Sequence, residues 1–313
     1  MTQLDVILLA GDRGAARSIH QQNKALLPLD GAPLLAHVLT ALHGVSRIRR
    51  IAVVGPMAEI QPVLNGFRHQ MPILPLEQRN TAYQNFWLAF CHLGQQPGID
   101  DRDPDRAVLV LPADVPLASA TELNQFLDNC NLNQLDYCVG MTSHTCLRRF
   151  YPTAQQPGIS MRYLHLADAD LRLNNLHLVK PLRVRNRDYI EDIYDFRYQK
   201  KPWNMLRAAR DLLRQPGIGW RAVWLYLLLQ LAGICHSLRW ASAQAFLQRR
   251  VERREIEAIA SAVLQTRAGI VETTGGGCAV DIDNARDYAT VTQRWQEFSR
   301  ARRPEPVSSE PQD

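Results

Sequence analysis

Near its N-terminus the chain reads Leu9-Ala10-Gly11-Asp12-Arg13-Gly14-Ala15-Ala16-Arg17 and then, from residue 24, Lys24-Ala25-Leu26-Leu27-Pro28-Leu29. The apolar run Asp5 to Ala10 leads into this loop, and Pro33 to Leu42 has helical periodicity, so the chain opens as strand, loop and helix. Small residues after a strand let backbone N–H groups approach phosphate oxygens, and Arg17 and Lys24 supply neutralising charge. The stretch predicts a phosphate-binding loop, with an ordinary turn bearing a surface Arg and Lys as the alternative.

Further strands and helices alternate along the first part of the chain. Residues 50–55 (RIAVVG) and 107–111 (AVLVL) read as strands, and residues 81–93 between them read as a helix. This alternation predicts an α/β fold with a doubly wound, mostly parallel sheet covered on both faces. Ligands of such sheets bind beyond the carboxyl ends of the strands.

The opening segment resembles the signature of the NTP-transferase superfamily, L-A-G-G-x-G-x-R followed by K-x-L-x-P-x-x-G-x-P-L, over about 30 residues. This superfamily includes MobA-like and sugar-phosphate nucleotidyltransferases and has a Rossmann-like, GT-A type fold. The chain departs from the pattern at Asp12, where Gly is usual, and at Ala16, where Ser or Thr is frequent. The resemblance implies that the nucleotide is bound by Ala10, Gly11, Gly14, Arg17 and Lys24.

A second motif is the apolar run Val108 to Pro112 followed by Ala113-Asp114-Val115-Pro116-Leu117. An acid after a strand lies at the carboxyl edge of the sheet, and Mg²⁺ needs only one or two carboxylates besides phosphate oxygens. Asp114 is therefore the preferred metal ligand, and an Asp that caps a helix or stabilises a turn is the alternative. The motif also resembles the D-x-P-L motif of the family, in which Asp binds the metal on the triphosphate.

A third motif, Asp281-Ile282-Asp283, follows the glycine run Gly275 to Gly277. Strand-like alternation points both acids to one face, where they can share a cation. The motif resembles the terminal D-[ILV]-D-T-P-E-D-[LY] segment of the family. Matching the two implies a second metal ligand at Asp283, with Asp281 the weaker candidate and an N-cap role for Asp283 the alternative.

Four further residues are candidates for contacts with the base or the acceptor. Asn80 and Thr81 open a predicted helix where the family reads base and ribose, and helix capping is their alternative role. Asn175 resembles the acceptor-side N-x-x-[LIV] strand of the family. Lys200 is a candidate for an acceptor phosphate, although a lysine pair (Lys200, Lys201) also suits a solvated surface.

The pattern predicts one nucleotidyltransferase domain, residues 1–299, and a disordered, proline-rich tail, residues 300–313. The domain divides into a nucleotide-binding half (1–140), an acceptor-side insertion (141–202), a helical region (203–266) and a return strand and helix (267–299). Beyond residue 140 we expect an extended run at residues 176–184 and a strand at residues 269–272. Helices are expected at residues 203–213, 219–238, 241–264 and 285–298.

The most apolar stretch of the chain is Trp220 to Leu238, whose length is close to that of a membrane-spanning helix. It contains Arg221, Gln230, His236 and Ser237, so a spanning helix is not expected. A helix packed on the domain is the expected structure. Its alternative is peripheral membrane contact through 220–238, with Trp220 and Trp224 as anchors.

Composition sets the remaining expectations. The net charge of +5 is mild, and the basic residues are scattered apart from clusters at 248–254 and 300–303, which suits a polyphosphate substrate and argues against nucleic acid. The six cysteines form no C-x-x-C pair, which favours a reducing compartment. The N-terminus lacks the basic and long apolar regions of a secretion signal, so a cytoplasmic location is expected.

Together these features predict a Mg²⁺-dependent nucleotidyltransferase that moves a nucleoside monophosphate from an NTP to a phosphorylated small-molecule or lipid-head-group acceptor and releases pyrophosphate. Lys24, Arg17 and Asp114 are the expected catalytic residues. A nucleotide-sugar-dependent glycosyltransferase is one alternative, although its D-x-D normally follows a middle strand. A non-catalytic nucleotide-sensing homologue is the other, and Asp12 is its best argument.

Overall fold

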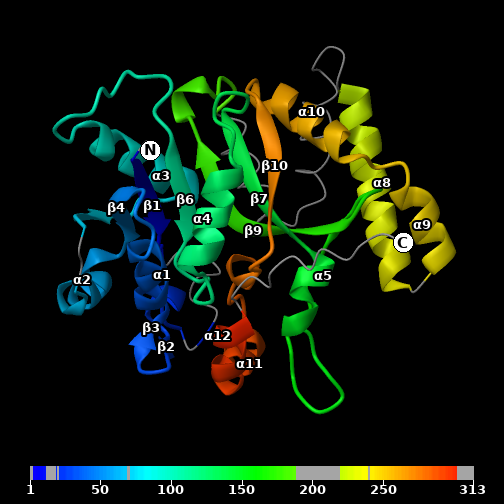
Figure 1. Cartoon of the computed structure of the whole chain (residues 1–313), viewed down its shortest axis with the longest axis horizontal. Helices are drawn as coiled ribbons and strands as arrows, with labels where there is room; N and C mark the ends of the chain where they lie inside the picture. Colours follow the sequence, from blue (N-terminus) through cyan, green and yellow to red (C-terminus); the bar gives the residue numbers. More distant parts are fainter. Residues whose placement is uncertain are drawn as a thin grey trace, which may run out of the picture.

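A computed structural model describes residues 3–11, 19, 21–68, 71–187, 219–238 and 240–301 of the chain. Its centre is an eight-stranded sheet in the order β10-β7-β9-β6-β1-β4-β5, with β8 paired to β9 (Figure 1). The strands are β1 (Leu4–Leu9), β4 (Ile48–Gly55), β5 (Ile73–Glu77), β6 (Val108–Pro112), β7 (Tyr137–Ser143), β8 (Leu164–His165), β9 (Asp170–Val179) and β10 (Ala268–Thr273). Each antiparallel pair among these strands includes β9, and the other pairs are parallel, so the predicted mostly parallel α/β fold is confirmed.

Helices cover both faces of the sheet because its strands are apolar on both sides. On one face Val6 and Leu8 of β1 pack with α1 (Leu34–His43), α2 (Met57–Gly66) and α4 (Ala120–Asn129). On the other face Ile7 packs with α3 (Ala82–Gly94). A hairpin of β2 (Pro28–Leu29) and β3 (Ala32–Pro33) precedes α1.

The C-terminal part adds helices around β10. These are α8 (Gly219–Ser237), α9 (Ala241–Gln248), α10 (Arg253–Leu264), α11 (Ala285–Gln293) and α12 (Trp295–Ala301), while α5 (His144–Leu147) follows β7. Figure 1 shows α8 and α9 side by side at the outer end of the molecule, on the β10 side of the sheet. Short 3₁₀ turns lie at η2 (Lys24–Leu26), η3 (Arg148–Phe150), η4 (Pro181–Arg183) and η5 (Gly277–Ala279).

Some predicted elements have different bounds in the structure. The extended run expected at 176–184 ends at Val179 and gives way to η4, because Pro181 has no N–H for the ladder. The helix expected at 241–264 is two helices, α9 and α10, and the helix expected at 285–298 is divided after Gln293 into α11 and α12. The helix expected at 203–213 and the tail from residue 302 lie outside the described residues.

The segment expected as an acceptor-side insertion, residues 141–202, begins inside β7 and contains β9, a strand of the central sheet. β9 lies between β6 and β7 and is antiparallel to both. The register of β9 against β7 shifts between Val139 and Met141, and Asn175 has a positive φ of 61° at this irregularity. A bulge of this kind bends a strand and redirects its side chains.

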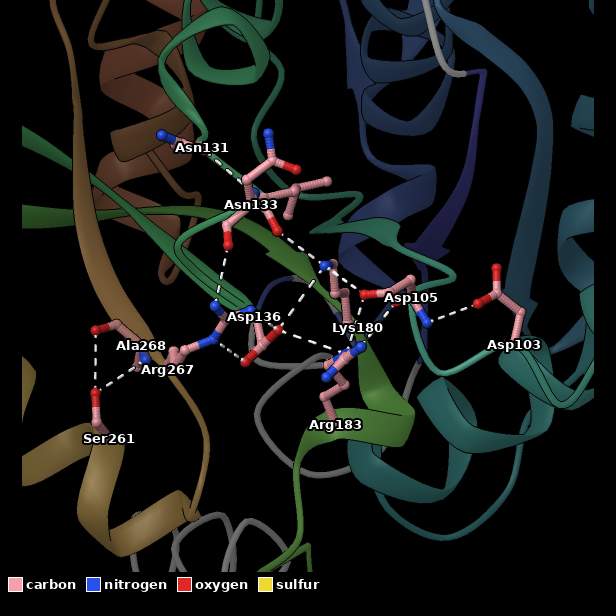
Figure 2. A network of polar contacts seen from close by, with 11 residues as sticks. Asp103, Asp105, Asn131, Asn133, Asp136, Lys180, Arg183, Ser261, Arg267 and Ala268 are labelled. Atoms are coloured by element: carbon pink, nitrogen blue, oxygen red, sulfur yellow. Dashed lines mark hydrogen bonds and ion pairs between the residues drawn. The ribbon is translucent and has the colours of Figure 1, made fainter.

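An ion-pair network joins strands at the edge where the parallel strands begin (Figure 2). Lys180 donates to Asp105 at 2.7 Å and to the carbonyl of Leu132 at 2.8 Å, and Arg183 also pairs with Asp105. Arg267, directly before β10, binds both oxygens of Asp136 at 2.6 and 2.7 Å. The network therefore connects the segment before β6 and the starts of β7 and β10 to the end of β9.

The apolar helix α8 packs on the domain by one face. Ala222, Leu225, Leu228 and Ala232 are buried, and Leu225 and Leu228 belong to a cluster with Met141 and residues of the β8–β9 region. The expected packing is thus confirmed for that face. No helix among the described residues is both long and apolar enough to cross a membrane.

Candidate active site

A cavity of about 430 Å³ lies beyond the carboxyl ends of β1 and β6. This is the edge where doubly wound sheets bind ligands. The predicted residues that line it are Ala10, Gly11, Lys24, Asn80, Thr81, Asp114, Asn175 and Asp283, together with Asp281. Segments from the whole length of the domain therefore meet at one site. Gly14, Arg17 and Lys200 lie outside the described residues, so their roles stay predictions.

Lys24 occupies the centre of this site. Its Nζ lies 3.0 Å from Asp283 and 3.5 Å from Asp114, and its side chain is buried. Burial by itself lowers the pKa of Lys24, but the two carboxylates outweigh this effect and raise it. Lys24 is therefore a positively charged group held between the two predicted metal ligands.

Asn23, which the sequence analysis did not single out, fixes the turn that carries Lys24. Its side-chain amide donates to the carbonyl of Ala10 at 3.0 Å, and its Oδ1 accepts from the N–H of Ala25 at 3.0 Å. The residue is fully buried, and it caps η2. An Asn directly before the lysine of the motif was the available signal, since Asn is a preferred N-cap residue.

The capping alternatives for the two aspartates are wrong. The N-cap of α4 is Ser119, whose hydroxyl accepts from the N–H of Glu122, and the N-cap of α11 is Asn284. Asp114 and Asp283 are thus left to face Lys24. The backbone also joins them, because the N–H of Ile282 donates to the carbonyl of Asp114 at 3.0 Å. Asp281 and Asp283 both line the cavity around a buried Ile282, although this segment is a loop and not a strand.

The acids of the site differ in their protonation behaviour. Burial raises the pKa of Asp114 to about 6, against the opposing effect of Lys24. Burial also raises the pKa of Asp281, with a further contribution from nearby Asp283. Burial acts in the same direction on Asp283, but the charge and hydrogen bond of Lys24 outweigh it and lower its pKa. The site therefore holds three acids whose negative charge Lys24 and Arg172 only partly neutralise.

Glu122 of α4, another residue the sequence analysis missed, supports the loop that carries these acids. Its buried carboxylate accepts from Thr273 Oγ1 at 2.8 Å and from the N–H groups of Gly276 and Cys278 at 2.9 and 3.0 Å. In the sequence Ser119 to Glu122 is typical of a capping box, in which the Glu reaches back to its own helix. Here the Glu reaches the glycine run instead, which no local pattern indicates.

β9 supports the same loop from the other side. Arg172 donates to Asp281 at 2.6 Å and to the carbonyl of Ala279 at 2.9 Å. Asn175 lines the cavity, and its amide donates to the carbonyl of Cys278 at 3.1 Å. Asn175 thus has a structural contact in the site, and its predicted contact with an acceptor stays a prediction.

The helix that begins at Ala82 closes the other wall of the cavity. Thr81 is its N-cap and accepts from the N–H of Gln84 at 3.1 Å, so the capping role proposed for this residue is confirmed. Asn85 is buried in the wall and accepts from the N–H of Arg79. The expected contacts of Asn80 and Thr81 with a nucleotide stay predictions, although both residues line the cavity.

The fold and this site together define a class of enzyme. A doubly wound sheet binds ligands at its carboxyl edge, and a lysine with separated aspartates there suits a metal-bound polyphosphate. Residues 6–217 match the MobA-like NTP transferase domain family. The chain belongs to this family and is a nucleotidyltransferase.

Two comparisons describe its relatives. Over 134 residues it is 31% identical to the bifunctional protein GlmU of Janthinobacterium sp. (strain Marseille), a match that covers 42% of this chain and 27% of that protein. The chain thus matches only about a quarter of the length of this curated relative. Among solved structures, a hypothetical transferase from Thermus thermophilus aligns with a TM-score of 0.58 at 22% identity over 91% of this chain and 99% of that chain, which shows a shared fold.

Proposed function

We propose that the chain uses Mg²⁺ to transfer a nucleoside monophosphate from an NTP to a phosphorylated small-molecule or lipid-head-group acceptor, with release of pyrophosphate. The observation that carries this proposal is the position of Lys24 between Asp114 and Asp283 in a cavity lined also by Ala10 and Gly11. A phosphoryl-type transfer needs positioned charge and no covalent nucleophile, so these groups suffice for it. The cytoplasm is the compartment we propose, from the cysteine pattern of the sequence.

The residues present fit a Mg²⁺ ion. Asp114 and Asp283 both lie within 3.5 Å of the same ammonium group, so their carboxylates face one shared space. Among the described residues no group of three or more His, Cys, Asp or Glu side chains forms a ready metal cage. Mg²⁺ commonly binds one or two carboxylates and takes its other ligands from phosphates and water. When bound, the ion supplies charge neutralisation at the phosphates.

The residues of the chain have separate roles in this proposal. Backbone N–H groups around Gly11 and Gly14 hold the triphosphate, and Arg17 steadies the leaving pyrophosphate. Asp114 and Asp283 hold the metal. Lys24 stabilises the charge that develops on the α-phosphate as the acceptor oxygen attacks in line and the bond to pyrophosphate breaks. Family membership favours this reaction over the glycosyl transfer and nucleotide sensing considered as alternatives.

Thermal stabilisation tests the nucleotide half of the proposal. Purified protein is heated with Mg²⁺ and each of ATP, CTP, GTP, UTP and dTTP, and we expect one or two of them to raise the unfolding temperature. The shift should be lost in Asp114→Asn and retained in Asp101→Asn, which changes an exposed acid outside the cavity. Equal shifts in both variants would remove Asp114 from the site.

Pyrophosphate release tests the transfer itself. The NTP that stabilises the protein is supplied with a panel of phosphorylated sugars, polyols and head-group alcohols, and pyrophosphate is measured with time. We expect release that depends on one acceptor class and on Mg²⁺. For Lys24→Ala, the loss in turnover should exceed the loss in NTP binding, because Lys24 acts mainly at the transition state. Acceptor-independent release at the same rate would contradict the proposed transfer.

A further inference from the structure

The helix α8 carries a second apolar face, which is separate from the face that packs on the domain. It consists of Trp220, Trp224, Leu227, Leu231, Ile234 and Leu238, all exposed, with Trp220 exposed by 73% and Leu238 by 52%. Their spacing of four, three, four, three and four residues places them within about 80° around a helix axis. We call these six residues the outer stripe.

The outer stripe continues onto the neighbouring helix. Trp240 and Phe246, which lie just before and within α9, are exposed by 61% and 57%. A surface helix normally has one apolar side, which packs on the core. A helix with a further apolar side is typical of one that also contacts a partner or a membrane. Monomeric proteins seldom expose so many large apolar side chains together, so this surface marks a site of interaction.

The charges of the α8–α9 hairpin identify the kind of partner. Residues 219–251 contain no Asp or Glu. They do contain the exposed residues Arg221, Arg249 and Arg250, and the guanidinium of Arg250 lies 4.3 Å from the centre of the Phe246 ring. The acids that contact the hairpin belong to other elements: Asp170 of β9 accepts a hydrogen bond from Gln248 at 3.1 Å, and Glu255 of α10 lies 3.6 Å from Arg221. The hairpin therefore presents apolar and positive groups without negative ones.

An anionic lipid surface fits this combination better than a second copy of the chain. Two such hairpins packed together would bring arginines near one another with no acid of the hairpin to pair them. A helix with Trp and Leu on one face and Arg beside it is typical of helices that lie in the bilayer interface, where Trp favours the head-group level. The hairpin has Trp220 and Trp224 at one end of the stripe and Trp240 at the other.

The geometry points to a peripheral membrane site: the outer stripe, with Trp240 and Phe246, inserts at the interface of an anionic phospholipid bilayer while Arg221, Arg249 and Arg250 bind its phosphates. This inference does not depend on which nucleotide or acceptor the active site takes. It requires only that the buried face of α8 stays packed on the domain, where Leu225 and Leu228 lie in a cluster with Met141.

Vesicle flotation of the full chain tests the site. We expect binding to phosphatidylcholine vesicles with about 30% phosphatidylserine to exceed binding to pure phosphatidylcholine by about tenfold or more, and to weaken as salt rises. Trp224→Ser combined with Leu231→Ser should reduce binding to the anionic vesicles by about tenfold or more, since both side chains lose the apolar phase. The nucleotide-induced thermal shift should not change, because neither residue lines the active-site cavity.

A charge reversal that leaves the apolar residues in place provides the second variant. Arg249→Glu with Arg250→Glu should also lower anionic binding by about tenfold or more. The matched control, Arg102→Glu with Arg148→Glu, changes two exposed arginines elsewhere and should bind as the unchanged protein does. Equal binding by all variants, or no binding to anionic vesicles, overturns the inference. A dimer of the unchanged protein in light scattering would also overturn the inference if the double Ser variant were a monomer and the unchanged protein bound no vesicles. The partner of the outer stripe would then be a second copy of the chain.

Discussion

At the scale of single residues, the two predicted metal ligands have opposite effects on stability. Burial raises the pKa of Asp114 to about 6, above its value in an unfolded chain, so its ionisation costs stability as pH rises from about 4 to 6. The pKa of Asp283 is lowered, so folding favours its charged form. One carboxylate is therefore held for function at a cost in stability, and the other is stabilised by Lys24.

We predict that Asp114→Asn raises the free energy of unfolding at pH 8, by up to about 2 kcal/mol, while turnover is abolished. The gain should shrink as pH falls through 6 and disappear near pH 4, where the Asp114 carboxyl of the unchanged protein is protonated in both the folded and the unfolded state. Asp283→Asn should instead lower stability at pH 8, because it removes the ionised partner of Lys24. Denaturant unfolding of the three proteins at pH 4 and pH 8 measures both effects. A loss of stability in both variants at pH 8 would show that Asp114 is not an unfavourable charge.

Glu122 is the residue through which α4 positions the metal-binding loop. Glu122→Gln replaces one acceptor oxygen by an N–H₂ group that faces backbone N–H donors, at a cost of about 2 kcal/mol in stability. We predict in addition that the Mg²⁺ concentration for half-maximal turnover rises several-fold, because Asp281 and Asp283 lose their fixed position. Glu59→Gln, an exposed change on α2, is the control. A lower melting temperature with an unchanged Mg²⁺ dependence would leave Glu122 with a structural role alone.

At the scale of elements, local sequence patterns predicted the strands and helices whose formation depends mainly on residues close in sequence. The runs at β1, β4, β6 and β10, and the helices α1 and α3, were predictable because apolar periodicity reports burial directly. β9 was harder, since Arg172, Asn174 and Asn175 interrupt its alternation, and its place between β6 and β7 depends on partners far along the chain. For the same reason Lys24, Asp114 and Asp283 could be selected from their local motifs, and Asn23 carried a local capping signal. The contact of Glu122 with the glycine run could not be predicted, because it joins segments more than 150 residues apart.

The bulge of β9 can be tested through the positive φ of Asn175. Glycine adopts this conformation without strain and alanine does not, so we predict that Asn175→Ala is less stable than Asn175→Gly by about 1 kcal/mol. Both variants lose the hydrogen bond to the carbonyl of Cys278, so any loss of activity they share reports that bond. Chemical denaturation and turnover are measured together. Equal stability of the two variants would mean that the strand does not impose this conformation.

At the scale of the whole molecule, the sheet separates two charged edges. The carboxyl edge carries the active site, where Asp114 and Asp283 contact Lys24 and also line an open cavity. The opposite edge carries the network of Figure 2, in which Asp136 and Asp105 are bound by Arg267, Lys180 and Arg183. The first arrangement leaves charge available for a ligand, and the second uses its charges to hold strands together.

This separation predicts that stability and ligand binding can be changed independently. Hydrogen bonds from Arg267 hold the pKa of the buried Asp136 carboxyl below its usual value. Its contribution to stability is therefore fully present above about pH 4 and is lost as pH falls below that value. Asp136→Asn should lower the free energy of unfolding at pH 7 by about 2 kcal/mol, since it removes the charged acceptor of two Arg267 hydrogen bonds while Lys180 keeps its ion pair with Asp105. It should also flatten the fall in stability between pH 4 and pH 2. The NTP affinity of the folded variant should stay within about twofold of the unchanged protein, because the sheet's length lies between the network and the cavity. A large loss of NTP affinity in Asp136→Asn would instead mean that strain at one edge reaches the other through β6, β7 and β9, the strands that join them.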